Sequence, residues 1–408
     1  MELKKYKLGD IAEVTTGFPF DGNLYSNNGI RVVRGENIGN GEMHWDKRID
    51  KRWEGSLSNL SKYYLFKGDI VMQMDGNVGK NISIILSEEP MLIAQRVACI
   101  RAKHLDNQKF VYHILRSKYF NTYIKNNATG TSVKHISLQQ IKDFSIPLPN
   151  RNWKQIGNLL SSLDQKIALN RKINDNLEAM AKQLYDYWFV QFDFPNEEGK
   201  PYKSSGGKMV WNEKLKREIP EGWSDGCFSD IANITMGQSP NGSSYNEDGE
   251  GEIFYQGSTD FGIRFPSVRM YTTAPNRFAK QGDILMSVRA PVGAVNIANT
   301  DCCIGRGLSA INSKIGSMTY IYFVIHYLKV RFDSLNSAGT TFGSITKDDL
   351  YGLPIVIPSS DVIKMYESIS KPIFDKQMNI GQEIENLTKQ RDELLPLLIN
   401  GQVSVNYD

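Results

Sequence analysis

The chain contains 408 residues, of which 40% are hydrophobic and 23% charged, with a formal net charge of +3. At roughly 150 residues per domain this length predicts two or three domains, and the composition excludes a disordered chain. No stretch approaches the ~18–20 uninterrupted apolar residues that a membrane span needs, which excludes a membrane-spanning protein. Because Met1–Lys7 lead directly into patterned sequence without the apolar core of a signal peptide, we expect a cytoplasmic location.

The charge is divided unevenly along the chain. Residues 1–192 carry 27 Lys+Arg against 19 Asp+Glu, a net of +8, and residues 193–408 carry 21 against 26, a net of −5. A basic half favours an anionic partner such as nucleic acid, although a surface of this charge is also common in proteins that bind none.

One internal repeat relates the two halves of the sequence. The offset between matched blocks drifts only from 220 to 209 residues. A period this long indicates two copies of a domain with different loop lengths rather than a solenoid. The matched blocks are 7–12 with 227–232, 67–72 with 281–286, 130–137 with 339–346, and 146–149 with 355–358.

Each copy begins with short β-type runs and ends in a long helical pattern. The runs 69–74 and 283–288 end in glycine-bearing turns, and helices are predicted over 109–118 and 318–329. After the proline-containing strand of each copy, apolar residues fall at heptad-like spacing, and the first such helix, 153–189, spans roughly 55 Å at 1.5 Å per residue. The predicted seam contains Ile173, Leu177, Met180 and Leu184 in the first helix and Ile373, Ile380, Ile384, Leu387 and Leu394 in the second.

Apolar residues at this heptad-like spacing are typical of either an ordinary helical bundle or an antiparallel coiled coil. Because one such helix follows each copy, the pattern favours a spacer between two similar domains. The predicted fold class is α+β, with two similar mixed α/β globular domains joined by two long helices packed as an antiparallel coiled coil. The predicted boundaries are a first domain at 1–149, a long helix at 150–192, an exposed connector rich in Gly, Pro, Ser and charge at 193–220, a second domain at 221–358, a second long helix at 359–402 and a tail at 403–408.

Catalytic motifs are missing from the sequence. The turn 76–81 has neither the spacing nor the hydroxyl of a nucleotide-triphosphate loop, and no Pro-Pro pair is present for an amino-methyltransferase tetrapeptide. The five histidines lack metal-ligand spacing, and the four cysteines lack a CxxC pair, so we expect reduced, structural thiols. We therefore expect no catalytic residue, no metal site and no cofactor in this chain.

Polar loops recur in both copies, and they are the candidate functional surfaces. Arg, Asn and Gln can read base edges with two hydrogen bonds, whereas Ser, Thr and Lys suit phosphates. Gly and Asn also simply make turns, so the duplication of the whole set carries the DNA-binding hypothesis. The candidate DNA-binding residues are Arg31, Arg34, Asn37, Gln73, Asn77, Lys80, Thr131, Ser132, Lys134 and His135 in the first copy, and Gln238, Ser239, Gln256, Ser258, Arg264, Arg289, Thr340, Thr341 and Ser344 in the second.

Several sequence features together resemble one family. They are the connector 193–208 with Arg-Glu-Ile-Pro-Glu-Gly-Trp at 217–223, the preceding Leu-Tyr-Asp-Tyr-Trp-Phe at 184–189, the repeated Gly-Asp-Ile, and the Ile-Pro-Leu-Pro strand at 146–149 that precedes a long helix. In this order and spacing they resemble the specificity subunit of type I restriction–modification enzymes, along essentially the whole chain.

The resemblance implies two target-recognition domains, each reading one half of a bipartite site in double-stranded DNA, and a helix pair that sets the gap between the halves. It also implies docking of two methyltransferase subunits, which bring S-adenosylmethionine, and of restriction (translocase) subunits, which bring ATP and Mg²⁺. Recognition domains diverge within the family, so the loop candidates depend on residue chemistry alone. The negative charge of 193–408 departs from what a DNA reader suggests, and we expect fewer phosphate contacts there.

Two other functions remain to be weighed against DNA recognition. A self-sufficient methyltransferase or nuclease is disfavoured by the missing motifs, and turnover by the purified chain would decide it. A coiled-coil adaptor that binds only proteins would fail to shift random DNA in a gel at any salt concentration.

Overall fold

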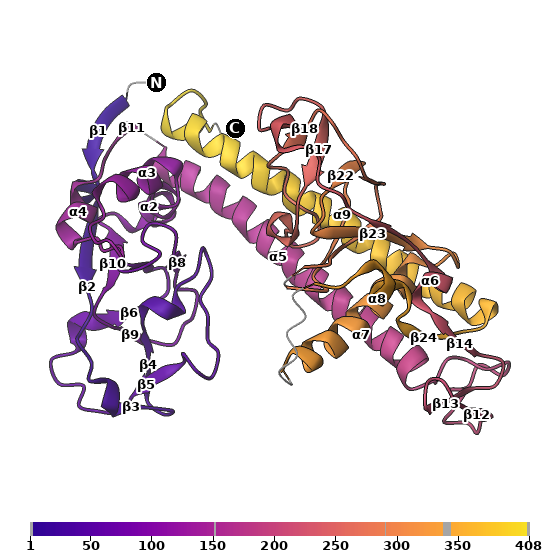
Figure 1. The fold of residues 1–408 in the computed structure, drawn as a ribbon. Coiled ribbons are helices and arrows are strands. Elements are labelled where there is room, and N and C mark those ends of the chain that lie inside the picture. Colours follow the sequence, from indigo (N-terminus) through magenta and orange to yellow (C-terminus); the bar gives the residue numbers. More distant parts are fainter. Residues whose placement is uncertain (1–2, 151, 290, 338–343, 406–408) are drawn as a thin grey trace. The chain divides into compact units, whose positions relative to one another are not determined.

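The computed structural model describes residues 3–150, 152–289, 291–337 and 344–405. These residues divide into two compact units. Unit 1 contains Met1–Ala168 and Asn386–Asp408, and unit 2 contains Leu169–Glu385. Two long helices, α5 (Trp153–Tyr185) and α9 (Ser360–Ile399), each contribute one segment to both units (Figure 1).

The described residues of unit 1 form three sheets and four short α-helices besides its segments of α5 and α9. Its strands are β1 (Leu3–Lys7), β2 (Ala12–Thr16), β3 (Tyr25–Ser26), β4 (Ile30–Val33), β5 (Lys51–Trp53), β6 (Tyr64–Leu65), β7 (Ile70–Gln73), β8 (Ile82–Ile84), β9 (Met91–Ile93), β10 (Val97–Ala102) and β11 (Ser145–Pro149). Its short helices are α1 (Leu8–Ile11), α2 (Gln108–Leu115), α3 (Lys118–Asn127) and α4 (Leu138–Asp143).

The central strands of unit 1 read as continuous apolar runs because both faces of their sheet are covered. The four-stranded sheet has the order β2-β10-β7-β8, and a five-stranded sheet has the order β3-β5-β4-β9-β6. Along β7, Ile70 and Met72 face a core shared with α2 and α3, whereas Val71 faces a core shared with the second sheet. Alternation of side chains along a strand produces this division, and the unit is therefore layered as helices, sheet and sheet.

Unit 2 repeats this architecture. Its strands are β12 (Met209–Asn212), β13 (Arg217–Pro220), β14 (Ser224–Cys227), β15 (Ala232–Met236), β16 (Tyr245–Asn246), β17 (Glu252–Tyr255), β18 (Tyr271–Thr272), β19 (Phe278–Ala279), β20 (Ile284–Ser287), β21 (Val295–Ile297), β22 (Cys302–Ile304), β23 (Leu308–Ser313) and β24 (Pro354–Ile357). Its helices besides α5 and α9 are α6 (Phe228–Ile231), α7 (Met318–Ser337) and α8 (Lys347–Tyr351).

The strand order of unit 2 matches that of unit 1 in every sheet of the repeat. The four-stranded sheet β15-β23-β20-β21 corresponds to β2-β10-β7-β8, and β16-β18-β17-β22-β19 corresponds to β3-β5-β4-β9-β6. Both five-stranded sheets contain one parallel pair, β4 with β9 and β17 with β22. The internal duplication that the sequence predicts is confirmed.

The repeated Gly-Asp-Ile motif forms the turn that enters β7 and β20. Gly68 and Gly282 have φ of 94° and 89°, a region that favours glycine. The following aspartates close the turn, because Asp69 accepts from Phe66 N and Asp283 from Lys280 N, both at 2.8 Å. The motif recurs because the same turn must start the same central strand twice.

Within each unit, segments of α5 and α9 pack antiparallel through a seam with heptad spacing. In unit 2, Asn174 of α5 contacts Gln377 of α9, and Tyr185 near the end of α5 contacts Tyr366 near the start of α9. In unit 1, Asp164 pairs with Arg391, and the start of α5 shares a core with the end of α9. The predicted seam residues of α9 all lie on its packed side: Ile380 and Ile384 are buried, and Ile373, Leu387 and Leu394 are half-buried.

The predicted seam of α5 is partly wrong. Leu177 and Leu184 are half-buried, but the side chains of Ile173 and Met180 are 37% and 57% exposed. The seam of unit 2 passes instead through Asn170, Asn174 and Ala181, together with those two leucines. An assignment from apolar residues alone missed the phase of the helix because two seam positions hold asparagine.

The connector is also more structured than its composition predicts. β12 and β13 pair as a hairpin, and Phe194 stacks on Trp223 with ring centroids 5.0 Å apart. Phe192, Phe194 and Ile219 are buried in the aromatic core of unit 2. The expected exposed connector is therefore wrong at both of its ends, while Gly199–Gly206 between them lies largely at the surface.

The four cysteines are free thiols, and burial raises the pKa of Cys99 and Cys302 to about 12, which fits the predicted structural role. Among the described residues, no helix is long and apolar enough to cross a membrane.

Candidate nucleic-acid interface

In unit 1, backbone hydrogen bonds bring loops that are far apart in the sequence together beyond the end of strand β7 of the four-stranded sheet. Met74 N donates to Arg96 O at 3.0 Å, Ile136 N to Met74 O at 3.0 Å, and Gly76 N to Lys134 O at 2.8 Å. These bonds join the loop after β7, the β9–β10 turn and the segment before α4. We name the result loop surface 1, defined as residues 73–81, 95–96 and 129–135.

Most of the predicted first-copy candidates lie on loop surface 1. Gln73 is half-buried, and its Oε1 accepts from Asn81 Nδ2 at 2.8 Å. Its side chain also lies beside Gly35, where an added Cβ would come within 3.3 Å of it, so the turn that contains Arg34 borders the surface. The exposed candidates here are Asn77, Lys80, Thr131, Ser132, Lys134 and His135.

Asp75 organises the charges of loop surface 1. Its two carboxylate oxygens contact His135 Nδ1 at 2.5 Å and Arg96 Nη1 at 3.0 Å. Arg96 has φ of 67°, a conformation that non-glycine residues rarely adopt, and its side chain is largely exposed. The loop therefore holds a largely exposed guanidinium against the Asp75 carboxylate.

Unit 2 builds a corresponding surface from the same backbone pattern. Val288 N donates to Gly307 O and Ile345 N to Val288 O, both at 2.9 Å. These bonds correspond to Met74–Arg96 and Ile136–Met74 in unit 1. We name this loop surface 2, defined as residues 238–239, 256–258, 288–289, 305–307 and 344–345.

Loop surface 2 carries a different set of side chains. Gln238, Gln256, Arg289 and Ser344 are exposed, and Ser239 and Ser258 are half-buried. Arg289 pairs with Ser344 in an isolated bridge, and Arg306 N donates to Ser239 Oγ at 3.2 Å. The structure thus brings six predicted second-copy candidates together. The candidates Thr340 and Thr341 lie outside the described residues.

Two candidates are corrected by their burial. Asn37 is 0% exposed, and its side chain bonds the backbone of Arg34, His44 and Ile49, so it closes a turn instead of contacting a partner. Arg264 is 9% exposed, and its guanidinium binds Glu178, Tyr322 and Gln377. Neither side chain is available to read a base.

Two further arginines already have carboxylate partners. Arg31 makes a two-bond pair with Asp50 at 2.9 and 2.8 Å and lies over the Trp45 ring. Arg34 pairs with Glu36 and lies over the Tyr25 ring. Arg31 supports the five-stranded sheet, whereas Arg34 retains a place at the border of loop surface 1.

Sequence analysis missed Arg96 and Arg306, which occupy the β9–β10 and β22–β23 turns at the centre of the two surfaces. The signal was present, because Gln95-Arg96 and Arg306 each interrupt two consecutive buried strands in corresponding turns of the repeat, although Gly307 is the residue that matches Arg96 in the backbone bonds. A charged residue between two apolar strands marks a turn at a sheet edge.

The chemistry of both surfaces is that of recognition. They present guanidinium, amide, hydroxyl and ammonium groups, and these suit base edges and phosphates. Among the described residues, no group of three or more His, Cys, Asp or Glu side chains could hold a metal ion.

Comparison with known proteins gives one consistent result. The family model described as the type I restriction modification DNA specificity domain matches residues 1–179 and 220–395, once in each copy. The chain belongs to this family. The resemblance found in the sequence is confirmed.

Individual relatives are similar to this chain over most of their own length. A putative type I restriction enzyme MjaX specificity subunit from Methanocaldococcus jannaschii is 32% identical over 363 residues, covering 85% of this chain and 81% of the relative. The MjaIX specificity subunit of the same organism is 25% identical and covers 99% and 94%. The crystal structure of the type I restriction-modification S subunit from M. genitalium aligns with a TM-score of 0.60 at 17% identity, covering 99% and 97%. The predicted fold class is confirmed by this likeness.

Proposed function

We propose that this chain is the sequence-specific DNA-recognition subunit of a type I restriction–modification complex, with each recognition domain reading one half of a bipartite site. The observation that carries the proposal is the recurrence of one loop frame in both units with different exposed side chains. Arg96, Gln73, Arg306 and Gln256 have the chemistry for base edges. The exposed Lys134 ammonium has the chemistry for phosphate.

The helix pair of α5 and α9 supplies the spacing between the half-sites and a docking surface for two methyltransferase subunits. The exposed apolar side chains of Ile173 and Met180 on α5 support such docking, because apolar groups on the solvent side of a helix favour a protein partner. The methyltransferase subunits bring S-adenosylmethionine, and restriction subunits bring ATP and Mg²⁺. This chain contributes recognition without catalysis, in the cytoplasm where the complex meets DNA.

The spacing role predicts half-site centres about one helical turn apart, roughly 10 bp and ~34 Å. Inserting seven residues, ~10 Å of helix, after Leu177 of α5 together with seven residues after Gln377 of α9, so that the two helices keep one register, should lengthen the unread gap by up to about three base pairs and leave both half-sites unchanged. A four-residue insertion shifts the seam out of phase and should instead damage assembly. An original gap in a folded, active heptad-insertion variant would contradict the spacing role.

A domain exchange tests the recognition role. The first recognition domain, 1–149, is replaced by that of a relative, and the chain is co-expressed with its methyltransferase partner. Sequencing of modified bases should then show one half of the methylated motif changed and the other half kept. A motif altered in both halves contradicts independent reading, and methyl transfer by the purified chain alone contradicts the non-catalytic role.

A further inference from the structure

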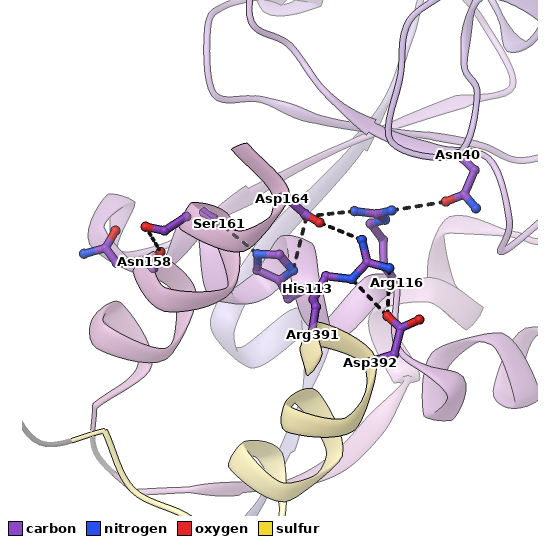
Figure 2. Close-up of polar contacts among 9 residues, drawn as sticks. Asn40, His113, Arg116, Asn158, Ser161, Asp164, Arg391 and Asp392 are labelled. Carbon is purple, nitrogen blue, oxygen red and sulfur yellow. Dashed lines mark hydrogen bonds and ion pairs between the residues drawn. The ribbon is translucent and has the colours of Figure 1, made fainter. Parts of the chain in front are cut away.

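A polar cluster in unit 1 joins the recognition domain to both long helices (Figure 2). Arg116, directly after α2, donates from Nη1 to Asp164 of α5 at 3.0 Å, and Arg391 of α9 donates to the other oxygen of Asp164 at 2.7 Å. The Arg116 guanidinium lies 5.1 Å from the ring centroid of Tyr112 in α2. We name this set clamp 1: Arg116, Asp164 and Arg391.

Unit 2 contains a cluster of the same design. Arg264 donates from Nη1 to Glu178 of α5 at 3.2 Å and from Nη2 to Gln377 of α9 at 3.0 Å, and Gln377 donates to Glu178 at 2.8 Å. The Arg264 guanidinium lies 5.1 Å from the ring centroid of Tyr322 in α7 and bonds the Tyr322 hydroxyl at 3.2 Å. We name this set clamp 2: Arg264, Glu178 and Gln377.

The two arginines reach equivalent places from different points of the sequence. Tyr112 is the fifth residue of α2 and Tyr322 the fifth of α7, and both guanidinium groups lie 5.1 Å from these rings. Four residues after the tyrosine, unit 1 has Arg116 and unit 2 has His326. In unit 2 the arginine comes instead from the loop at 264. Each unit therefore places a guanidinium against the matching tyrosine ring, although the two arginines come from different points of the sequence.

We propose that the two clamps fix the register of α5 against α9 and the seating of each recognition domain on the helix pair. Arg116 and Arg264 are then positioning residues for the gap between half-sites, and neither contacts a base. This inference rests on the proposed function for its DNA consequence. Its structural part, the register, stands independently of DNA.

The physical reason is that the apolar positions of a heptad seam do not by themselves specify its register. A slip of seven residues places apolar side chains opposite apolar side chains again, so packing alone discriminates weakly. Seven residues to either side of Arg391 on α9 lie Ile384 and Leu398, and either would leave the Asp164 carboxylate without its α9 cation. Asp164 would keep Arg116 but lose one of its two charge-assisted hydrogen bonds, which favours the register that retains both.

The same argument applies in unit 2. Seven residues to either side of Gln377 lie Ser370 and Ile384, neither of which has an amide to bridge Glu178 and Arg264. Both arginines reduce the stability of the fold at one atom, because the buried Nε atoms of Arg116 and Arg264 have no hydrogen-bond partner. Retaining such a group in both clamps fits a role in specifying register better than a role in maximising stability.

A relocation experiment tests whether the guanidinium itself matters. In the full-length chain co-expressed with its methyltransferase partner, Arg264→Ser should give methylated sites with more than one gap length, with both half-sites unchanged. Adding His326→Arg places the arginine four residues after Tyr322, as Arg116 stands after Tyr112, and should restore a single gap. A purely structural loss at 264 would not be repaired from another element.

A register measurement separates this inference from the proposed function. Spin labels at Ile173→Cys and Asn379→Cys, both exposed positions within unit 2, report the α5–α9 distance in a Cys227→Ser background. The chain with clamp 2 unaltered should give one distance between the two labels. A chain with an apolar clamp 2 should give a second population of distances; its substitutions are Arg264→Met, Glu178→Leu and Gln377→Leu. This readout needs neither DNA nor a partner subunit.

The outcomes are distinct. A single distance and a single gap in a folded apolar-clamp variant overturn the inference. A second distance with an unchanged gap keeps the register lock and overturns its role in spacing. If the apolar variant does not fold, the relocation pair decides: failure of His326→Arg to restore the single gap in a folded chain overturns the positioning role.

Discussion

Loop surface 1 and loop surface 2 share their backbone hydrogen bonds and differ in the side chains that those bonds present. Surface 1 presents Arg96 and His135, which both contact Asp75, together with the exposed Lys80 and Lys134. Surface 2 presents two arginines, Arg289 and Arg306, together with neutral amides and hydroxyls. The frame is independent of the reading groups, because main-chain atoms build it. Two copies of one fold can therefore present different side chains without altering their cores.

The same contrast between a conserved frame and altered side chains appears beneath the surfaces. His113 follows Tyr112 on α2, and Phe323 follows Tyr322 on α7. Asp69 and Asp283 close the same turn, but Asp69 pairs with Arg101 through two bonds of 2.6 Å, whereas Asp283 receives one bond of 3.2 Å from Asn312. Each difference predicts that the two units respond differently to acid or to substitution.

The largest difference should appear on acidification. His113 is 2% exposed, and burial lowers its pKa from 6.5 to about 4, against the opposing effect of Asp164 and together with Arg116, Arg391 and Lys109. Because the unfolded chain binds this proton first, unit 1 should lose stability as the pH falls from about 6.5 to about 4, by up to about 3 kcal/mol. Hydrogen exchange measured at pH 7 and pH 5 should show faster opening of α2 at the lower pH. The reference is the His113→Phe chain and not α7, because burial also lowers the pKa of His326 on α7.

The control variant is His113→Phe, which copies the residue of unit 2. It should remove this part of the acid dependence, since phenylalanine has no proton to bind. Equal acid sensitivity of α2 in the variant and the parent chain would assign the effect to other groups.

The next largest difference should appear in the free energy of unfolding when each buried aspartate is replaced. Asp69→Asn leaves the Arg101 guanidinium without its carboxylate and should lower the free energy of unfolding by about 2 kcal/mol. Asp283→Asn should cost less at pH 7, because burial raises the pKa of Asp283 and so makes the ionised carboxylate less favourable in the folded chain than in the unfolded chain. A carboxyl group with a raised pKa in the folded chain contributes stability that is present at low pH and lost as the pH rises. The free energy of unfolding of Asp283→Asn should therefore fall furthest below that of the parent chain at low pH.

Urea unfolding of both variants measures these effects, and a double-mutant cycle of Asp69→Asn with Arg101→Met isolates the pair. Equal decreases in the free energy of unfolding for Asp69→Asn and Asp283→Asn would show that the shared turn, and not the ion pair with Arg101, determines the effect.

The sequence predicted the elements that local pattern determines and missed those that tertiary contact determines. The duplication, the long helices and most loop candidates followed from periodicity and turn residues. The seam of α5 did not, because Asn170 and Asn174 occupy packed positions that an apolar search passes over. Arg264 looked like a loop cation, and only the contacts with Glu178 and Gln377 reveal it as a clamp.

Base reading should be lost separately in the two surfaces. Arg96→Ala and Arg306→Ala should each weaken specific binding by roughly 1–3 kcal/mol and relax the methylated motif at one position in its own half-site. Binding assays with the complex and sequencing of modified bases measure both effects. Arg31→Ala serves as a matched control, since its guanidinium is held by Asp50 and Arg31 belongs to neither loop surface as defined. Relaxation of both half-sites by one substitution would contradict separate reading.

The smallest effect concerns phosphate contacts, and it tests why the two halves differ in charge. Lys134 lies on loop surface 1, exposed, with its backbone oxygen fixed by Gly76 N, so its ammonium can approach a phosphate without ordering the loop anew. Lys134→Ala should weaken binding to all sequences alike and lower the slope of log affinity against log salt by about one, with the motif unchanged. Lys200→Ala is the comparison, since this lysine is exposed in the connector beside Glu198 and should leave the slope unchanged. If Lys134→Ala instead changed one base of the motif at constant slope, Lys134 would be a reader. The positive charge of the first half would then serve specificity rather than general attraction to DNA.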